Sequence, residues 1–302
     1  MKVLVTGANG FLGSEIVNNL ERNNISVISL VRNKSKNHIN EKTIVMSNFK
    51  SETEWADILD GIDVVVHLIA RTHNTSEKDA DTYPLYHDTN VVITETLCNA
   101  ILGSSVKKLV FMSSIKVNGE STEFNPFNEN SIEKPEDNYG ITKREAELVI
   151  QKKFELSAKD YIIIRPPLIY GGKAKGNLEM LLKVIQKKIP LPFKCIRNAR
   201  SIVSLSTLAK FTTLCVKETI IRNELFLVAN NKIYTTSELI EKIAKDNAQT
   251  CIQFCIPTFI LNAMLIAIGK GEISKKLLQD LQIDNSKAVF IAEKFSAKEI
   301  FN

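Results

Sequence analysis

Through the first two thirds of the chain, short apolar runs alternate with longer stretches in which apolar residues recur every three or four positions. The short runs predict buried strands and the longer stretches predict amphipathic helices. The run at 64–68 lacks the polar alternation of a half-exposed strand, so we expect it to be buried on both faces. The predicted strands are 2–5, 26–30, 43–46, 64–68, 108–112 and 161–165. The predicted helices are 13–23, 52–59, 83–103 and 138–156.

Alternating strands and helices of these lengths predict an α/β fold, a Rossmann-type doubly wound parallel sheet. The pattern loosens after Gly171 and Gly172, where helices at 178–187, 206–217 and 237–245 and one strand at 225–228 are expected. We therefore expect a dinucleotide-binding domain with the catalytic residues over 1–171. A smaller, mostly helical substrate-binding portion is expected over 172–302, with part of its chain free to return to the sheet.

Composition and charge fit a globular enzyme better than a nucleic-acid or membrane protein. The 302 residues are 44% apolar and 24% charged, and the net charge of +5 comes without a block of like charges, so no nucleic-acid partner is expected. The longest apolar run, 259–268, contains Asn262 and is too short for an integral membrane segment. We interpret it as a buried or interfacial helix and leave peripheral membrane contact open. Met1 leads straight into the first strand, so no signal peptide and a cytoplasmic location are expected.

The cysteines are scattered, with no CxxC pair and no nearby histidine to complete a metal site. We expect no metal and five reduced thiols. They are Cys98, Cys195, Cys215, Cys251 and Cys255.

A glycine-rich segment follows the first strand and opens the first helix. Gly7 permits a tight turn, Gly10 lets the backbone approach a pyrophosphate, and Gly13 lets the helix pack closely on the strand. Phe11 and Leu12 lie between the last two glycines, at the helix N-terminus that would face the phosphates. The spacing and its position favour a dinucleotide cofactor.

The end of the second strand bears on the choice of cofactor. A carboxylate there usually holds the 2′-hydroxyl of NAD, but this chain has Arg32 and no acidic residue in reach. We therefore favour NADP (NADPH) over NAD, which stays the alternative. Asn48 and Phe49 follow the third strand and are expected to contact the cofactor. The Asn48 amide could accept from the adenine amino group, and the alternative is an ordinary turn asparagine.

A tyrosine and a lysine stand four residues apart on the helix predicted at 138–156. Residues at this spacing share one helix face, so Tyr139 and Lys143 are expected side by side, with the ammonium lowering the tyrosine pKa. Such a phenol suits proton transfer. Ser114 follows the strand 108–112 and would hydrogen-bond a substrate oxygen.

Together these motifs resemble the extended short-chain dehydrogenase/reductase family, in its nucleotide-sugar epimerase, dehydratase and reductase branch. The matching segments are the glycine loop, His67-Leu-Ile-Ala70, Asn90, Ser113-Ser114, Tyr139-x-x-x-Lys143 and Arg165-Pro-Pro-Leu-Ile-Tyr-Gly171. The resemblance covers the first 171 residues in the expected order.

The resemblance implies roles for individual residues. Tyr139 would be the general acid or base, Lys143 would hold the nicotinamide ribose, and Ser114 would bind the reacting oxygen. His67 is better explained as a packed residue at a strand end than as a catalytic one. The further cofactor contacts implied are Ala70, Asn90 and Pro166.

On the substrate side, Asn177 and Leu178 match the segment that holds a nucleotide diphosphate in sugar-nucleotide members. Arg200 matches a family arginine that binds the same diphosphate, for which a guanidinium is well suited. A UDP-sugar is therefore the expected substrate, with a lipid diphosphate as the alternative carrier. The resemblance also implies a homodimer formed through the helices 83–103 and 138–156.

One departure from the family pattern narrows the choice of reaction. Dehydratases of this branch carry an acidic pair directly after the active-site hydroxyl residue, where this chain has Ile115 and Lys116. Dehydration is therefore not expected. The leading hypothesis is NADPH-dependent reduction of the C4 ketone of a UDP-4-keto-6-deoxy-N-acetylhexosamine, giving UDP-N-acetylquinovosamine for polysaccharide biosynthesis. The alternatives are an NAD-dependent UDP-glucose or UDP-N-acetylglucosamine 4-epimerase and, less favoured, a non-catalytic NADP-sensing protein.

Overall fold

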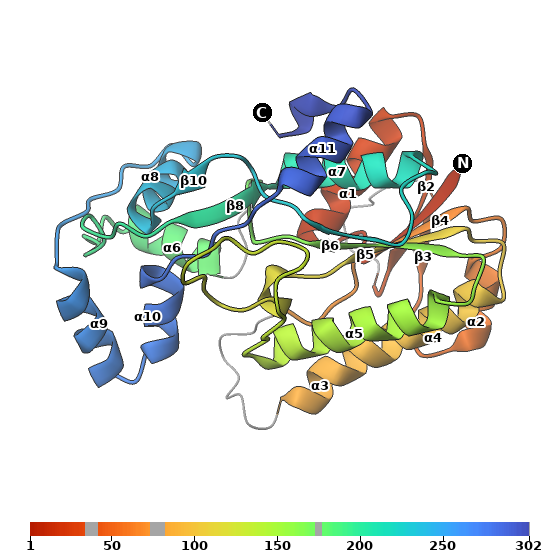
Figure 1. The fold of residues 1–302 in the computed structure, drawn as a ribbon, viewed down its shortest axis with the longest axis horizontal. Coiled ribbons are helices and arrows are strands. Elements are labelled where there is room, and N and C mark those ends of the chain that lie inside the picture. Colours follow the sequence, from red (N-terminus) through yellow and green to blue (C-terminus); the bar gives the residue numbers. More distant parts are fainter. Residues whose placement is uncertain (34–41, 73–81, 173–176, 302) are drawn as a thin grey trace.

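The computed structural model describes residues 1–33, 42–72, 82–172 and 177–301. Its centre is a seven-stranded sheet of order β3-β2-β1-β4-β5-β6-β9, in which every neighbouring pair is parallel (Figure 1). The α/β fold expected from the sequence is therefore confirmed. The strands of this sheet are β1 (Lys2–Thr6), β2 (Ser26–Val31), β3 (Thr43–Val45), β4 (Val64–His67), β5 (Lys108–Met112), β6 (Asp160–Arg165) and β9 (Glu224–Leu227).

Helices cover both faces of the sheet, and each face buries its own hydrophobic cluster (Figure 1). β4 is buried along its whole length, as its unbroken apolar run predicts. One face carries α1 (Phe11–Arg22), α7 (Leu205–Lys217) and α11 (Ser286–Lys294). The other carries α2 (Glu52–Ile58), α4 (Ile93–Leu102) and α5 (Asn138–Phe154).

The helix expected at 83–103 is confirmed, with an interruption that the sequence pattern did not predict. It runs as α3 (Tyr83–His87), a π-helical turn at Asp88–Val92, and α4. Such turns are frequent at functional sites. Here the turn contains Asn90, one of the residues of the family resemblance.

The C-terminal portion forms a second layer beyond the carboxyl ends of the main strands and also returns to the sheet. Its strand β9 pairs in parallel with β6. A small sheet of order β10-β8-β7 carries the remaining strands. These elements are β7 (Leu168–Tyr170), α6 (Asn177–Gln186), β8 (Arg200–Ser204), β10 (Ile233–Tyr234), α8 (Thr236–Asp246), α9 (Thr258–Ala267), α10 (Gly271–Leu278) and a 3-10 turn at Lys298–Ile300.

One expectation from the sequence is wrong in this portion. Cys195 and Cys255 form a disulfide, because backbone hydrogen bonds such as Lys194 N to Phe254 O (3.2 Å) hold their two segments side by side. The apolar run 259–268 forms the helix α9, as expected, but of its two alternatives a buried helix is excluded, since Leu261 is its one buried residue. None of the helices in the described ranges is both long enough and apolar enough to span a membrane.

Candidate active site

The glycine loop connects β1 to α1 at the point where the strand order of the sheet reverses. Gly7 has a φ of +67°, and no side chain caps the N-terminus of α1 at Gly10. A Cβ on Gly13 would lie 2.3 Å from the carbonyl oxygen of Gly7, so close packing of helix on loop requires glycine there. The loop therefore fits the pyrophosphate of a dinucleotide, which uses free helix N–H groups and close backbone approach.

The structure brings Ser114 and Tyr139 together, although they come from different elements. Ser114 follows β5 and accepts a hydrogen bond from the backbone N–H of Lys116 (3.3 Å). Tyr139, in the first turn of α5, is hydrogen-bonded to Ser114. Gly140 makes this approach possible, because a Cβ there would lie 2.7 Å from the carbonyl oxygen of Lys116.

Lys143 lies one turn further along α5 and is almost completely buried. Its ammonium is 4.0 Å from the centre of the Phe111 ring. Burial lowers the pKa of Lys143 to about 7, and the nearby Glu147 opposes this shift. The prediction that Lys143 lowers the pKa of Tyr139 is wrong here: burial raises the pKa of Tyr139 to about 12, so the phenol is protonated at neutral pH.

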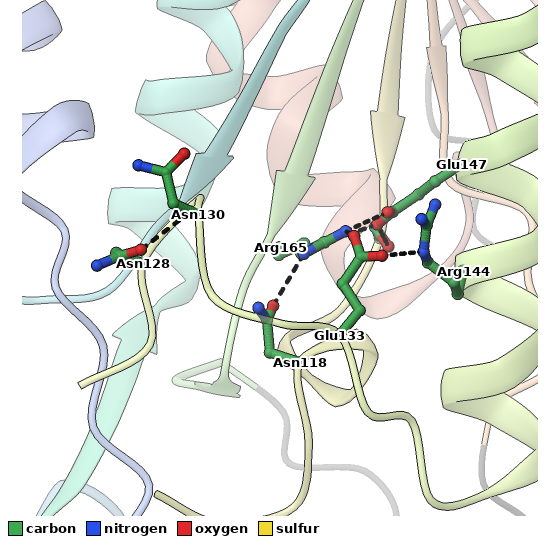
Figure 2. Close-up of polar contacts among 8 residues, drawn as sticks. Asn118, Asn128, Asn130, Glu133, Arg144, Glu147 and Arg165 are labelled. Carbon is green, nitrogen blue, oxygen red and sulfur yellow. Dashed lines mark hydrogen bonds and ion pairs between the residues drawn. The ribbon is translucent and has the colours of Figure 1, made fainter. Parts of the chain in front are cut away.

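A network of charged and polar side chains joins the end of β6 to the catalytic helix α5, and sequence reasoning missed it (Figure 2). Arg165, at the end of β6, donates to Glu147 from Nε (2.9 Å) and Nη2 (2.5 Å). The same guanidinium donates to Glu133 (2.5 Å) and to Asn118 (3.0 Å). Ser113, next to Ser114, donates to Glu147 as well.

One signal for this network was present in the sequence. Glu147 continues the four-residue spacing of Tyr139 and Lys143 along α5, so the three share a helix face. Glu133 gave no such signal, because it lies in a loop and meets Arg165 only through the fold.

His67 is a packed strand-end residue, as expected. Its ring is buried between Thr6 (Nδ1 to Oγ1, 2.8 Å) and Thr94 (Nε2 to Oγ1, 3.1 Å). The Thr94 hydroxyl donates to the carbonyl of Asn90, so it accepts from Nε2, and Nδ1 accepts from Thr6. Burial, with a smaller effect of Lys143, lowers the pKa of His67 to about 3, so this ring stays neutral.

Asn90 joins the segment after β4 to the catalytic helix. Its side chain accepts from the backbone N–H of Arg71 (2.7 Å) and donates to the Thr142 hydroxyl (3.0 Å). Thr142 lies between Tyr139 and Lys143 on α5, so Asn90 fixes the position of that helix. This agrees with a role in shaping the site; direct contact with a cofactor stays a prediction.

The remaining cofactor candidates lie at the carboxyl ends of the strands. Arg32 is exposed directly after β2, and its guanidinium is 6.0 Å from the Phe49 ring. Asn48 accepts from the backbone N–H of Lys50 (3.1 Å), which is a turn interaction. Ala70 follows β4, and Pro166 follows β6. All five residues stand at the sheet edge where such folds bind dinucleotides.

The substrate-side candidates are less closely grouped. Arg200 opens β8 and donates to the carbonyl of Gln279 (3.1 Å). Burial lowers the pKa of Arg200, while the charges of Glu120 and Asp280 oppose that shift. α6 begins at Asn177, which precedes Leu178.

Lys116, which stands where dehydratases carry an acid, is bound in ion pairs. Its ammonium contacts Glu120 (2.8 Å) and Asp137, and Asp137 caps α5 by accepting from the backbone N–H of Gly140 (2.7 Å). Burial alone would lower the pKa of Lys116, but these two carboxylates raise it. Through Asp137, Lys116 therefore helps to fix the N-terminus of α5. A lysine with this structural role, in place of the dehydratase acid, agrees with the expectation that the protein does not eliminate water.

The parallel sheet carries a glycine loop at its switch point. A serine follows β5, and a tyrosine and a lysine lie in the first turns of α5. These features define a Rossmann-type enzyme of the short-chain dehydrogenase/reductase kind. The model of the NAD dependent epimerase/dehydratase family matches residues 3–205, and the chain belongs to this family.

Two of the similar relatives are named as sugar 4-epimerases. A UDP-glucose 4-epimerase of Vibrio cholerae is 32% identical over 286 residues, covering 94% of this chain and 87% of the relative. An N-acetyl-alpha-D-glucosaminyl-diphospho-ditrans,octacis-undecaprenol 4-epimerase of Escherichia coli O157:H7 is 31% identical, covering 61% of this chain and 53% of the relative.

Solved structures confirm the fold at lower sequence identity. The UDP-glucuronic acid 4-epimerase from Bacillus cereus in complex with NAD has a TM-score of 0.76 at 19% identity, covering 97% of this chain and 90% of its own. The UDP-glucose 4-epimerase from Thermotoga maritima with UDP-glucose has a TM-score of 0.75 at 20% identity, covering 96% and 92%.

Proposed function

We propose that this protein reduces the C4 ketone of a UDP-4-keto-6-deoxy-N-acetylhexosamine with NADPH, giving UDP-N-acetylquinovosamine. The observation that carries the proposal is the protonated Tyr139 hydrogen-bonded to Ser114. A phenol with a pKa near 12 holds its proton at neutral pH, and reduction of a ketone requires a proton donor next to the new alkoxide.

The residues have separate tasks in this reaction. Ser114 donates a hydrogen bond to the ketone oxygen and stabilises the charge that develops there. Tyr139 gives its proton to the same oxygen, and the Lys143 ammonium, one helix turn from Tyr139 on α5, stabilises the phenolate that remains. The nicotinamide, when bound, supplies the hydride. The glycine loop holds the pyrophosphate and Lys143 the nicotinamide ribose.

The choice of NADPH rests on the end of β2. Arg32 is exposed there and can meet a 2′-phosphate, and the two residues on either side, Val31 and Asn33, are not acidic. A ribose 2′-hydroxyl would find no carboxylate at this position. Arg200, which opens β8, is the proposed ligand of the substrate diphosphate.

A second candidate is an NAD-dependent 4-epimerase of UDP-glucose or UDP-N-acetylglucosamine. The name of the Vibrio cholerae relative, which aligns with nearly the whole chain, favours it. It would use the same serine, tyrosine and lysine, with Tyr139 first accepting the proton of the C4 hydroxyl.

One pair of assays separates these candidates. The purified protein is mixed with UDP-4-keto-6-deoxy-N-acetylglucosamine and either NADPH or NADH, and nicotinamide absorbance is followed. Stoichiometric oxidation of NADPH is the expected result. If no reduced cofactor is consumed, and UDP-glucose or UDP-N-acetylglucosamine is instead converted to its C4 epimer without added reductant, the epimerase is correct.

A further inference from the structure

The helix α9 (Thr258–Ala267) exposes apolar side chains that a helix of this composition normally buries. Phe259 is 74% exposed, Ile266 58% and Ile268, which caps the helix, 64%. A helix that is apolar on all sides is usually found in a core or a membrane. Single exposed apolar residues are common on proteins, but a contiguous group indicates an interaction surface.

α9 and α10 (Gly271–Leu278) form a hairpin at one edge of the molecule, well separated from the central sheet (Figure 1). The hydroxyl of Ser274 on α10 donates to the amide oxygen of Asn262 on α9 (2.6 Å). This bond satisfies the polar side chain in the middle of α9, and α9 itself has no charged residue. Within the hairpin, α9 therefore presents an almost wholly apolar surface, while α10 carries charged residues.

Positive charge surrounds this apolar surface. The loop 187–200 contains five basic residues and no carboxylate, and 258–279 contains three lysines and one glutamate. The two segments are adjacent, because the Asn198 side chain donates to the carbonyls of Leu277 (3.1 Å) and Gln279 (3.0 Å). The exposed cations are Lys187, Lys188, Lys194, Arg197, Lys270 and Lys275, of which Lys275 is paired with Glu136 at 3.2 Å.

We propose that the α9–α10 hairpin docks this protein on the surface of an anionic lipid bilayer. The apolar side chains of α9 enter the boundary between headgroups and acyl chains, and the surrounding lysines contact anionic headgroups. The ten residues of α9 extend for about 15 Å, half of the roughly 30 Å of a bilayer core, so the helix lies on the membrane and does not cross it.

The charge pattern favours a membrane over a second copy of this chain. A two-fold dimer places the same patch on both sides of its interface. Two α9–α10 surfaces in contact would therefore bring two basic sets together. In each copy, Glu136, which pairs with Lys275, and one glutamate within 258–279 would offset only part of that charge. An anionic bilayer supplies the opposite charge and an apolar layer at once.

Vesicle co-sedimentation of the full-length protein tests the proposal. Wild-type protein is expected to sediment with vesicles of phosphatidylcholine and phosphatidylglycerol, and less with phosphatidylcholine alone or at high salt. The triple variant Phe259→Ser, Ile266→Ser, Ile268→Ser is expected to bind roughly tenfold more weakly or worse. The matched control is Leu156→Ser with Phe290→Ser, because these side chains are 98% and 65% exposed after α5 and on α11, away from the hairpin.

Folding and turnover are measured on the same variants. All of them should keep the melting temperature and the catalytic rate of the wild type, so that lost vesicle binding cannot be attributed to unfolding. Vesicle binding does not depend on the reductase proposal, and either can fail alone. The docking proposal is overturned if the wild type does not bind anionic vesicles or if the triple variant binds them as well as the wild type does. It is also overturned if the wild type binds no vesicles but forms a dimer in sedimentation velocity that the triple variant abolishes.

Discussion

Arg165 and Glu147 form a buried double hydrogen bond directly behind the catalytic residues, with donor–acceptor distances of 2.9 and 2.5 Å. Arg165 ends the strand β6, and Glu147 lies one helix turn beyond Lys143. The pair therefore fixes the catalytic helix to the end of the sheet. Its carboxylate also opposes the loss of charge that burial imposes on Lys143.

Removing Arg165 should therefore destabilise the protein strongly. Arg165→Met leaves Glu147 buried without its partner, and breaking a buried pair in this way costs about 3–5 kcal/mol. The exposed pair Arg222–Asp160, at 3.6 Å, provides the control, since Arg222→Met should cost at most about 1 kcal/mol. Urea unfolding of both variants measures the difference, and equal small losses would show that the buried pair does not hold the fold.

The order of the strands in the main sheet and of their connecting helices could be predicted over the first 171 residues, because these elements carry their own periodicity; the short strand β7 was not predicted. β5 was predicted to the residue, and α5 within two residues of its end. The glycine loop, Ser114, Tyr139 and Lys143 could be found because each has a local motif. The position of Glu133 against Arg165 could not, since it arises from packing between segments 32 residues apart.

The degree of burial of individual side chains could not be predicted from the sequence either. The spacing of Tyr139 and Lys143 predicted a lowered tyrosine pKa, but loss of hydration raises it and lowers that of the lysine. The disulfide between Cys195 and Cys255 was missed for a similar reason: the two residues are 60 positions apart and have no shared motif. The exposure of α9 likewise depends on what the fold leaves uncovered.

Gly140→Ala should impair catalysis more than stability. The added Cβ would meet the carbonyl oxygen of Lys116 at 2.7 Å, so α5 must move and carry Tyr139 away from Ser114. A shift of this kind is expected to lower kcat by roughly tenfold or more. Gly103→Ala is the control, because its Cβ would lie 3.8 Å from its nearest neighbour. Steady-state kinetics and thermal melts compare Gly140→Ala with Gly103→Ala. An unchanged kcat in Gly140→Ala would mean that catalysis does not require the close approach of α5 to Lys116.

His67 should make the protein sensitive to acid. The pKa of His67 is about 3 in the folded protein and 6.5 for an ordinary histidine, so below pH 6.5 the unfolded chain binds a proton that the folded chain excludes. The stabilising contribution of the neutral ring is complete above pH 6.5 and falls as the pH drops toward 3.

The variant His67→Gln removes this titration. Its free energy of unfolding should fall less steeply between pH 6 and 4, by up to about 1.4 kcal/mol per pH unit, the value for one proton. Urea unfolding at a series of pH values gives both slopes. Parallel slopes would contradict a neutral, buried His67 in the folded protein.

Tyr139→Phe should abolish turnover while leaving cofactor binding intact. The substitution removes the proton donor but keeps the ring, and loss of a general acid lowers kcat by about 10²–10⁴-fold. Stopped-time assays of product and fluorescence titration of NADPH measure the two quantities separately. The half-buried residue Tyr161, at the opposite end of β6 from Arg165, serves as the matched control, because Tyr161→Phe should leave both unchanged. Turnover that survives in Tyr139→Phe would rule out the proposed proton transfer.

Arg32→Asp should reverse the preference between the two nicotinamide cofactors. Arg32 is exposed after β2 near Phe49, where a carboxylate can accept from the ribose 2′-hydroxyl of NADH and repel the 2′-phosphate of NADPH. The ratio of kcat/KM for NADPH to that for NADH is expected to fall by about tenfold or more, the effect of exchanging one charged contact of about 1.4 kcal/mol. Arg22→Asp, at the far end of α1, makes the same change of charge away from the loop and should leave the ratio unaltered. If the ratio falls equally in both variants, the cofactor preference comes from the net charge of the protein. If the ratio is unchanged in Arg32→Asp, Arg32 does not contact the cofactor, and the main argument for NADPH is lost.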